Sequence, residues 1–197
     1  MLTESTSFSP IIGSFDQPQT QTSSELGRME ETGYKIFCPD KKIFVQFGEY
    51  VNGMYLLYKG KAEARVMSLQ GNKFIVFSMK PLCIFGEAPF LNNRKSNLEI
   101  EVYAKSILYY YDKNSVKYLL EKSSLFKDLI IKSIMLKAQI SIEHLSNIYN
   151  LSPEQRVSKS LYHLCIDQGI KIDNKYILNI SQEDIATFSG LSRVTIA

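Results

Sequence analysis

The side chains best suited to contact another molecule lie near the C-terminus, in the segment ISQEDIATFSGLSRVTIA. Arg193 and Thr195 fall at the start of a predicted helix, where their side chains would be exposed. An exposed Arg can donate two hydrogen bonds to O6 and N7 of guanine, and a Thr can contact a phosphate or a thymine methyl group. The pattern favours contact with DNA, and the alternative is a plain pair of helices with a surface Arg.

Catalysis and metal binding find little support in the sequence. His144 and His163 are the only histidines, and no Ser-His-Asp or Cys-His arrangement is visible. Cys38, Cys83 and Cys165 lie far apart and form none of the close pairs that metal or redox motifs need. We therefore expect no metal, no cofactor and no enzymatic activity. The cysteines are expected to act as small buried hydrophobes, with a thiol sensor as the alternative.

A helix-turn-helix must position the candidate DNA contacts. Ser181 is placed to cap one helix, Gly190 to make the turn, and Ser192 to cap the next helix. Leu191 follows the turn and would fix the angle between the two helices. Composition adds no independent sign of nucleic-acid binding, because the net charge is only +3 and residues 150–197 carry five basic and five acidic groups.

A long helix is predicted from Asn114 to Tyr149, because its core contains neither Gly nor Pro. Apolar and small residues recur three and four positions apart, which is the seam of a coiled coil: Ile131, Ile134, Ala138, Ser141, Leu145 and Ile148. A second stripe widens the apolar arc, formed by Leu129, Met135, Leu136, Ile140 and Ile142. The pattern predicts one face against a partner helix and one against its own domain; a core helix of a monomer is the alternative.

Short β-branched and aromatic runs begin at Gly33 and continue to about Asp112, separated by turn residues. Strands of this length and spacing indicate an antiparallel sandwich or barrel, and Gln70-Gly71-Asn72 reads as a hairpin turn. No run of 18 apolar residues and no secretory signal is present, so we expect a cytoplasmic protein without a membrane span. The predicted fold class is α+β, in four parts: a mobile lead-in (1–27), a β-roll (28–113), a dimerisation helix (114–149) and a DNA-binding domain (150–197).

Taken in order from Gly33 to Ala197, these pieces resemble the Crp/Fnr family of bacterial transcription regulators. Glycines fall where that family's cyclic-nucleotide-binding-like β-roll has its corners, namely Gly48, Gly60, Gly71 and Gly86. Phe85-Gly86-Glu87 looks like the start of its phosphate-binding cassette. The resemblance implies a homodimer with an effector between roll and long helix, and a winged helix that reads a palindromic DNA operator; RNA polymerase is a candidate partner.

The resemblance also implies which residues contact DNA: Ser181, Gln182, Ser192, Arg193, Val194 and Thr195. Many family members have a Glu at the Val194 position, which reads a cytosine. A Val can pack on a thymine methyl group instead, so we expect an operator richer in A·T at that step. The family's recognition helix continues for further turns and a β-wing, which this sequence does not include. As given, the chain is expected to dimerise and to bind DNA poorly.

The same resemblance implies an effector site near Gly86, Glu87, Ala88, Leu98, Glu99 and Lys137. Members that bind cyclic nucleotides have an Arg beside a Ser or Thr where this sequence has Leu98 and Glu99. A carboxylate would oppose a phosphate there, so we expect a different effector. Lys137 under the run Tyr109-Tyr110-Tyr111 suits a phenolic or aromatic acid, and the family branch that senses halogenated phenols looks similar and also carries Val at the Val194 position.

Three alternatives stay open at this point. The first is that Lys137 is a surface lysine that extends its charged end into water, and the second is that Glu87 is a solvated turn residue. The third is that the whole chain is a small-molecule or redox sensor whose C-terminal domain does not bind DNA.

Overall fold

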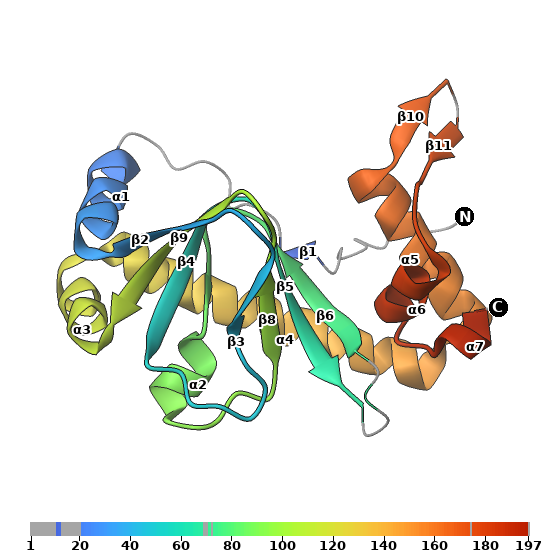
Figure 1. The fold of residues 1–197 in the computed structure, drawn as a ribbon, viewed down its shortest axis with the longest axis horizontal. Coiled ribbons are helices and arrows are strands. Elements are labelled where there is room, and N and C mark those ends of the chain that lie inside the picture. Colours follow the sequence, from blue (N-terminus) through green and yellow to red (C-terminus); the bar gives the residue numbers. More distant parts are fainter. Residues whose placement is uncertain (1–10, 13–20, 69–70, 72, 174, 197) are drawn as a thin grey trace.

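The computed structural model of the chain consists of a β-roll, a long helix that runs behind it, and a small helical unit at the C-terminal end (Figure 1). This arrangement confirms the predicted α+β class. Among the described residues no helix combines the length and the apolar character needed to cross a membrane. The structure describes residues 11–12, 21–68, 71, 73–173 and 175–196.

Two sheets form the roll. The first has the strand order β1 (Ile11–Ile12), β6 (Lys73–Met79), β5 (Ala62–Met67), β8 (Glu99–Val102) and β3 (Lys42–Val45). The second has the order β2 (Tyr34–Cys38), β9 (Ser106–Asp112), β4 (Gly53–Lys59) and β7 (Cys83–Phe85). Neighbouring strands of the described roll are antiparallel except β1, which is parallel to β6. The predicted antiparallel roll is thus confirmed.

Alternation along the strands decides which side chains fill the roll. On β8, Ile100 and Val102 are buried, whereas Glu99 and Glu101 between them reach the opposite face. Apolar residues from both sheets meet in one core, which includes Val45, Leu57, Phe77, Phe85 and Leu108. The two sheets are therefore packed face to face, and charged side chains occupy the outer surface.

The corners of the roll use the glycines that the sequence singled out. Gly48, Gly60, Gly71 and Gly86 all have φ between 79° and 101°. Gly60 has a second reason to be glycine, because a Cβ there would overlap the side chain of Ser106. Gln70 and Asn72 of the predicted hairpin turn lie outside the described residues.

Helix α1 (Gln21–Thr32) includes residues 21–27, which the sequence analysis assigned to a mobile lead-in. Its Glu25 carboxylate accepts hydrogen bonds from Ser123 Oγ (2.8 Å), Ser124 Oγ (2.8 Å) and Leu125 N (2.7 Å). The bond from the Leu125 backbone, with those from the two serines, lowers the pKa of the Glu25 carboxyl. This part of the lead-in is therefore fixed to the start of α4 (Ser124–Asn150).

The single helix predicted over 114–149 is in fact two, α3 (Lys113–Lys122) and α4 (Ser124–Asn150). Ser123 between them is fully buried with an extended backbone (φ −125°, ψ 116°), and its Oγ accepts from Phe126 N at 3.1 Å. A Ser side chain can take over backbone hydrogen bonds in this way and start a new helix. The prediction was wrong here because no Gly or Pro marks the break.

The C-terminal unit contains the remaining helices and a hairpin. Helix α5 (Pro153–Gln168) begins at the Ser152 cap, and the short strands β10 (Ile170–Ile172) and β11 (Lys175–Ile177) follow it. Helices α6 (Gln182–Ser189) and α7 (Arg193–Ile196) complete the unit, while the short α2 (Glu87–Asn92) lies in the roll.

Candidate functional site

Lys137 on α4 reaches into the roll and meets Glu87, the first residue of α2. The distance from Lys137 Nζ to Glu87 Oε1 is 2.6 Å, and the same nitrogen donates to the Ile84 carbonyl at 2.7 Å. Glu87 is 2% exposed and the Lys137 side chain 15% exposed. Lys137 is therefore not a surface lysine, and Glu87 is not a solvated turn residue. The contact joins the long helix to the cassette region of the roll.

Neighbouring residues hold this ion pair in place. Gly86 has φ 80°, which starts α2 sharply and aims Glu87 inward. Ser133, one turn before Lys137, donates from Oγ to the Ile84 carbonyl at 2.9 Å. Because Ser133 and Lys137 are four apart, they lie on one face of α4 and both bind the same strand. Strand β7 is thus fixed against α4 by two adjacent turns of the helix.

Cys83, on the same strand, lies beside this contact. Its Sγ is 3.7 Å from Ser133 Oγ, and burial raises the pKa of the thiol, although the charge of Lys137 acts in the opposite direction. A buried thiol with a raised pKa is a poor nucleophile. The structure thus favours the packing role for Cys83 over the thiol sensor.

The other predicted effector residues divide into two groups. Ala88 is exposed on α2 next to Glu87, and Leu98 packs against the core of the roll. Glu99 faces the outer surface of the first sheet, where its Oε1 accepts from Lys73 Nζ at 2.6 Å. The structure does not bring Glu99 to the Lys137–Glu87 pair. The carboxylate that would face an incoming anion is instead Glu87 itself.

The run Tyr109-Tyr110-Tyr111 does not cover the Lys137–Glu87 site. Tyr109 and Tyr111 belong to a separate core with Phe126 at the start of α4, and Tyr111 stacks edge-on with Phe126 at a centroid distance of 5.3 Å. Phe77 is the aromatic ring near the cation, 5.8 Å from Lys137 Nζ. Sequence reasoning missed it because β6 and α4 are adjacent only in the fold.

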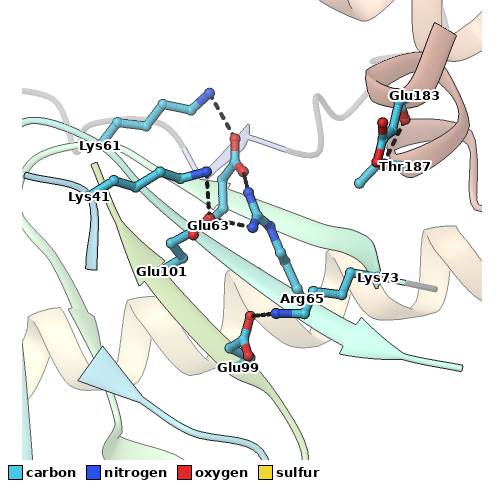
Figure 2. A network of polar contacts seen from close by, with 9 residues as sticks. All are labelled: Lys41, Lys61, Glu63, Arg65, Lys73, Glu99, Glu101, Glu183 and Thr187. Atoms are coloured by element: carbon cyan, nitrogen blue, oxygen red, sulfur yellow. Dashed lines mark hydrogen bonds and ion pairs between the residues drawn. The ribbon is translucent and has the colours of Figure 1, made fainter. Parts of the chain in front are cut away.

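A network of ion pairs covers the outer face of the first sheet and faces α6 (Figure 2). Glu63, 1% exposed, accepts from Lys61 at 2.9 Å and Arg65 at 2.8 Å, and Arg65 also pairs with Glu101. Burial disfavours the Glu63 charge, but Lys61 and Arg65 hold its pKa below the usual value. The alternation of Lys61, Glu63 and Arg65 along β5 is the sequence signal that would have revealed this charged face.

The cap and the turn that the sequence predicts between α6 and α7 are present. Asp184 N donates to Ser181 Oγ at 3.1 Å, and Gly190 ends α6 with φ 65°. Leu191 and Ala186 are buried between the helices, 8% and 4% exposed. The angle between α6 and α7 is therefore set by apolar packing at the turn.

The candidate DNA contacts lie around this turn. Arg193 and Val194 are exposed on α7, Val194 at 88%. Ser192 Oγ lies 2.8 Å from Thr195 Oγ1, so part of the Thr195 hydroxyl's capacity is used in the cap. Ser181 and Gln182 are exposed at the start of α6. Ser192 and Arg193 also line a hollow of about 740 Å³ between the C-terminal unit and the charged sheet face.

The predicted dimer seam is exposed along α4. Ile131 and Leu145 are each 55% exposed, Ile134 42% and Ile148 59%, with Ala138 exposed and Ser141 half-buried between them. The second stripe divides: Leu129, Leu136 and Ile140 pack inside the chain, whereas Met135 and Ile142 join the exposed face. The helix thus buries one face against its own domain and leaves the other without a partner among the described residues.

Comparisons with known proteins agree with this architecture. Residues 35–123 match the family model described as the cyclic nucleotide-binding domain, whereas no curated protein sequence matches the chain. Among solved structures, the c-di-GMP-responsive regulator CLP of Xanthomonas campestris is similar at TM-score 0.77 and 13% identity, over 88% of this chain and 87% of that one.

CprK in complex with OCPA is similar at TM-score 0.65 and 16% identity, over 87% and 80% of the two chains. Oxidized CprK with o-chlorophenolacetic acid gives TM-score 0.52 and 18% identity, over 88% and 73%. At these identities the structures establish the fold, which is that of the Crp/Fnr regulators.

The buried ion pair makes a first prediction. Lys137→Met leaves the Glu87 charge buried without its cation, and should lower the free energy of unfolding by about 3–5 kcal/mol. Adding Glu87→Gln should recover part of that loss, because the uncompensated charge is then removed. Urea unfolding of the single and double variants measures both effects as a double-mutant cycle.

Lys127→Met is the matched control, because Lys127 is exposed on the same helix. It should change stability by less than about 0.5 kcal/mol. Equal, small effects of Lys137→Met and Lys127→Met would show that the ion pair contributes nothing to folding.

Proposed function

We propose that this chain, which belongs with the Crp/Fnr regulators by its fold and its cyclic nucleotide-binding domain, is a ligand-responsive transcription regulator that binds specific DNA sequences as a homodimer. Its effector is a small organic molecule other than a cyclic nucleotide. The observation that carries the proposal is that one helix, α4, meets the roll interior through Lys137, exposes an apolar seam, and ends at the helix-turn-helix unit.

The seam supports a homodimer. Isoleucine and leucine side chains at coiled-coil spacing are half exposed along α4, a pattern that costs free energy in water. A second copy of the same helix presents the same spacing and would cover it. Two-fold pairing would also place two helix-turn-helix units side by side, as a palindromic operator requires.

The surroundings of Glu87 argue against a cyclic nucleotide. The cation next to Glu87 is Lys137, and its charge is already neutralised at 2.6 Å. Leu98 occupies the position where the resemblance would place an Arg, and it packs into the core. Like any anion, a phosphate could bind here only by displacing Glu87 from Lys137, and Leu98 supplies no second cation to hold it.

An organic acid could take the place of Glu87 beside Lys137. Its carboxylate would replace Glu87 as the partner of Lys137, and its apolar body would lie near Phe77. Glu87 would then leave the buried site and take α2 with it. Because Lys137 and Ser133 bind β7 on adjacent turns, this exchange would change how α4 sits against the roll and how two copies pair.

Specific contact with DNA is assigned to the exposed residues around the turn. Arg193 is the candidate for a bidentate contact with guanine, and Val194 for a thymine methyl group. In the present arrangement Ser192 and Arg193 line the hollow against the roll. A duplex must therefore enter from the exposed side of α7, or the C-terminal unit must turn away from the sheet.

Leu145→Glu tests the homodimer. A charge within the apolar seam should dissociate the dimer and weaken operator binding with it, because each half-site would then be bound alone. Sedimentation velocity measures the assembly and fluorescence anisotropy the DNA binding. Ile166→Glu is the matched control, since Ile166 on α5 is 58% exposed and Leu145 55%. A Leu145→Glu protein that remains dimeric would exclude this seam.

The effector class is tested by thermal unfolding with o-chlorophenolacetic acid and with cyclic AMP. A ligand at a hundred times its Kd adds roughly 2.7 kcal/mol of stability, which is readily measured. We expect stabilisation by the acid, its loss in Lys137→Met, and no effect of cyclic AMP. Stabilisation by cyclic AMP alone would overturn the proposed effector class while leaving the DNA-binding role intact.

Val194→Glu tests the assignment of the recognition helix. Selection of operators from random DNA should yield A·T at one step of each half-site for the native protein. The variant should shift that step toward G·C, with a discrimination of about 1–3 kcal/mol, because a Glu accepts a hydrogen bond from cytosine. An unchanged selected operator would show that Val194 does not read this base pair.

A further inference from the structure

A cavity of about 80 Å³ lies where the end of α4 meets the C-terminal unit, near the right-hand end of α4 in Figure 1. Helices α4, α5 and α6 all contribute to its wall. Its apolar side is formed by Ile140, Leu164 and Phe188. Its polar side is formed by Glu143, His144, Arg156, Lys159 and His163. The cavity is separate from the Lys137–Glu87 contact.

Two polar atoms of this wall are buried without a hydrogen-bond partner, His144 Nε2 and Arg156 Nε. A buried polar atom without a partner is unfavourable, because it has lost its hydrogen bonds to water. Burial lowers the pKa of His144, although a backbone hydrogen bond to Val76 acts the other way, and burial also lowers the pKa of His163. The site therefore holds unused hydrogen-bonding capacity that a suitable ligand would satisfy.

The charges of the wall leave one cation available. Lys159 Nζ lies 2.6 Å from Glu143 Oε1 and 3.0 Å from Asn147 Oδ1. The charges of Lys159 and Glu143 therefore neutralise each other. Arg156 forms no ion pair among the described residues. A ligand with a single negative charge would complete the charge balance of the cavity.

We propose that this cavity is a second ligand site, which binds a short-chain monocarboxylic acid. The carboxylate would accept from Arg156 Nε and from His144, and the alkyl chain would lie against Leu164 and Phe188. A water molecule needs about 10–15 Å³ of such space, so the cavity suits a molecule of roughly five to eight non-hydrogen atoms. A nucleotide is too large for it.

A ligand in this position would join three helices. His144 belongs to the long helix, Arg156 to α5, and Phe188 to α6 of the helix-turn-helix. Binding would therefore hold the C-terminal unit in one orientation relative to α4. A ligand in this site would act on the C-terminal unit without binding to the roll. The proposal therefore does not depend on the effector proposed above.

The two histidines provide a direct measurement. They are the only histidines of the chain and both line this cavity, so the ring Cε1–H signals in a ¹H–¹³C NMR spectrum report on this site alone. Butyrate, titrated through the millimolar range into the full-length protein, should shift both signals in a saturable way. His144→Gln assigns the two signals. Titration without any shift of either signal would overturn the proposal.

Three comparisons test the chemistry of the site. The neutral 1-butanol, and butyrate with Arg156→Gln, should each bind at least about tenfold more weakly, because a charge-assisted hydrogen bond is lost. Arg94→Gln, at an exposed arginine of the roll, should bind butyrate like the native protein. Equal binding of butyrate and 1-butanol would overturn the role of Arg156.

Discussion

The ion pair between Lys137 and Glu87 determines how the long helix α4 packs against the roll. Both groups are buried, and removing charges from water is so costly that neither can remain there without the other. Lys137 also donates to the Ile84 carbonyl, so the pair fixes the position of α4 along its axis relative to β7. Any molecule that enters this site must supply a charge in exchange. The position of α4 against the roll therefore depends on this pair remaining intact.

The start of α4 is fixed by a second set of polar contacts. Glu25 accepts three hydrogen bonds at the first turn, and the buried Ser123 separates this helix from α3. Between this end and Lys137 the helix packs on its own domain. Its opposite face carries exposed apolar residues along the whole seam, from Ile131 to Ile148. One face of the helix is therefore packed by the chain itself, and the other is left without a partner among the described residues.

Sequence reasoning succeeded where the determinants are local. The caps at Ser181 and Ser192 and the turn at Gly190 are short-range signals, and the structure has them. It failed where contacts over long sequence distances decide. The break at Ser123 depends on Glu25, 98 residues away, and no local pattern shows it. The aromatic ring near Lys137 is likewise invisible in the sequence, because a run of tyrosines does not say which strand lies over α4.

The orientation of the helix-turn-helix is the least constrained part of the architecture. On the roll, Lys61, Glu63 and Arg65 mostly neutralise one another, so the sheet face offers little net charge to hold α6 in place (Figure 2). At the end of α4 the wall of the cavity contains unsatisfied polar atoms, and packing there is incomplete. The polar contacts at this junction are therefore less complete than those at the start of α4, where Glu25 accepts three hydrogen bonds.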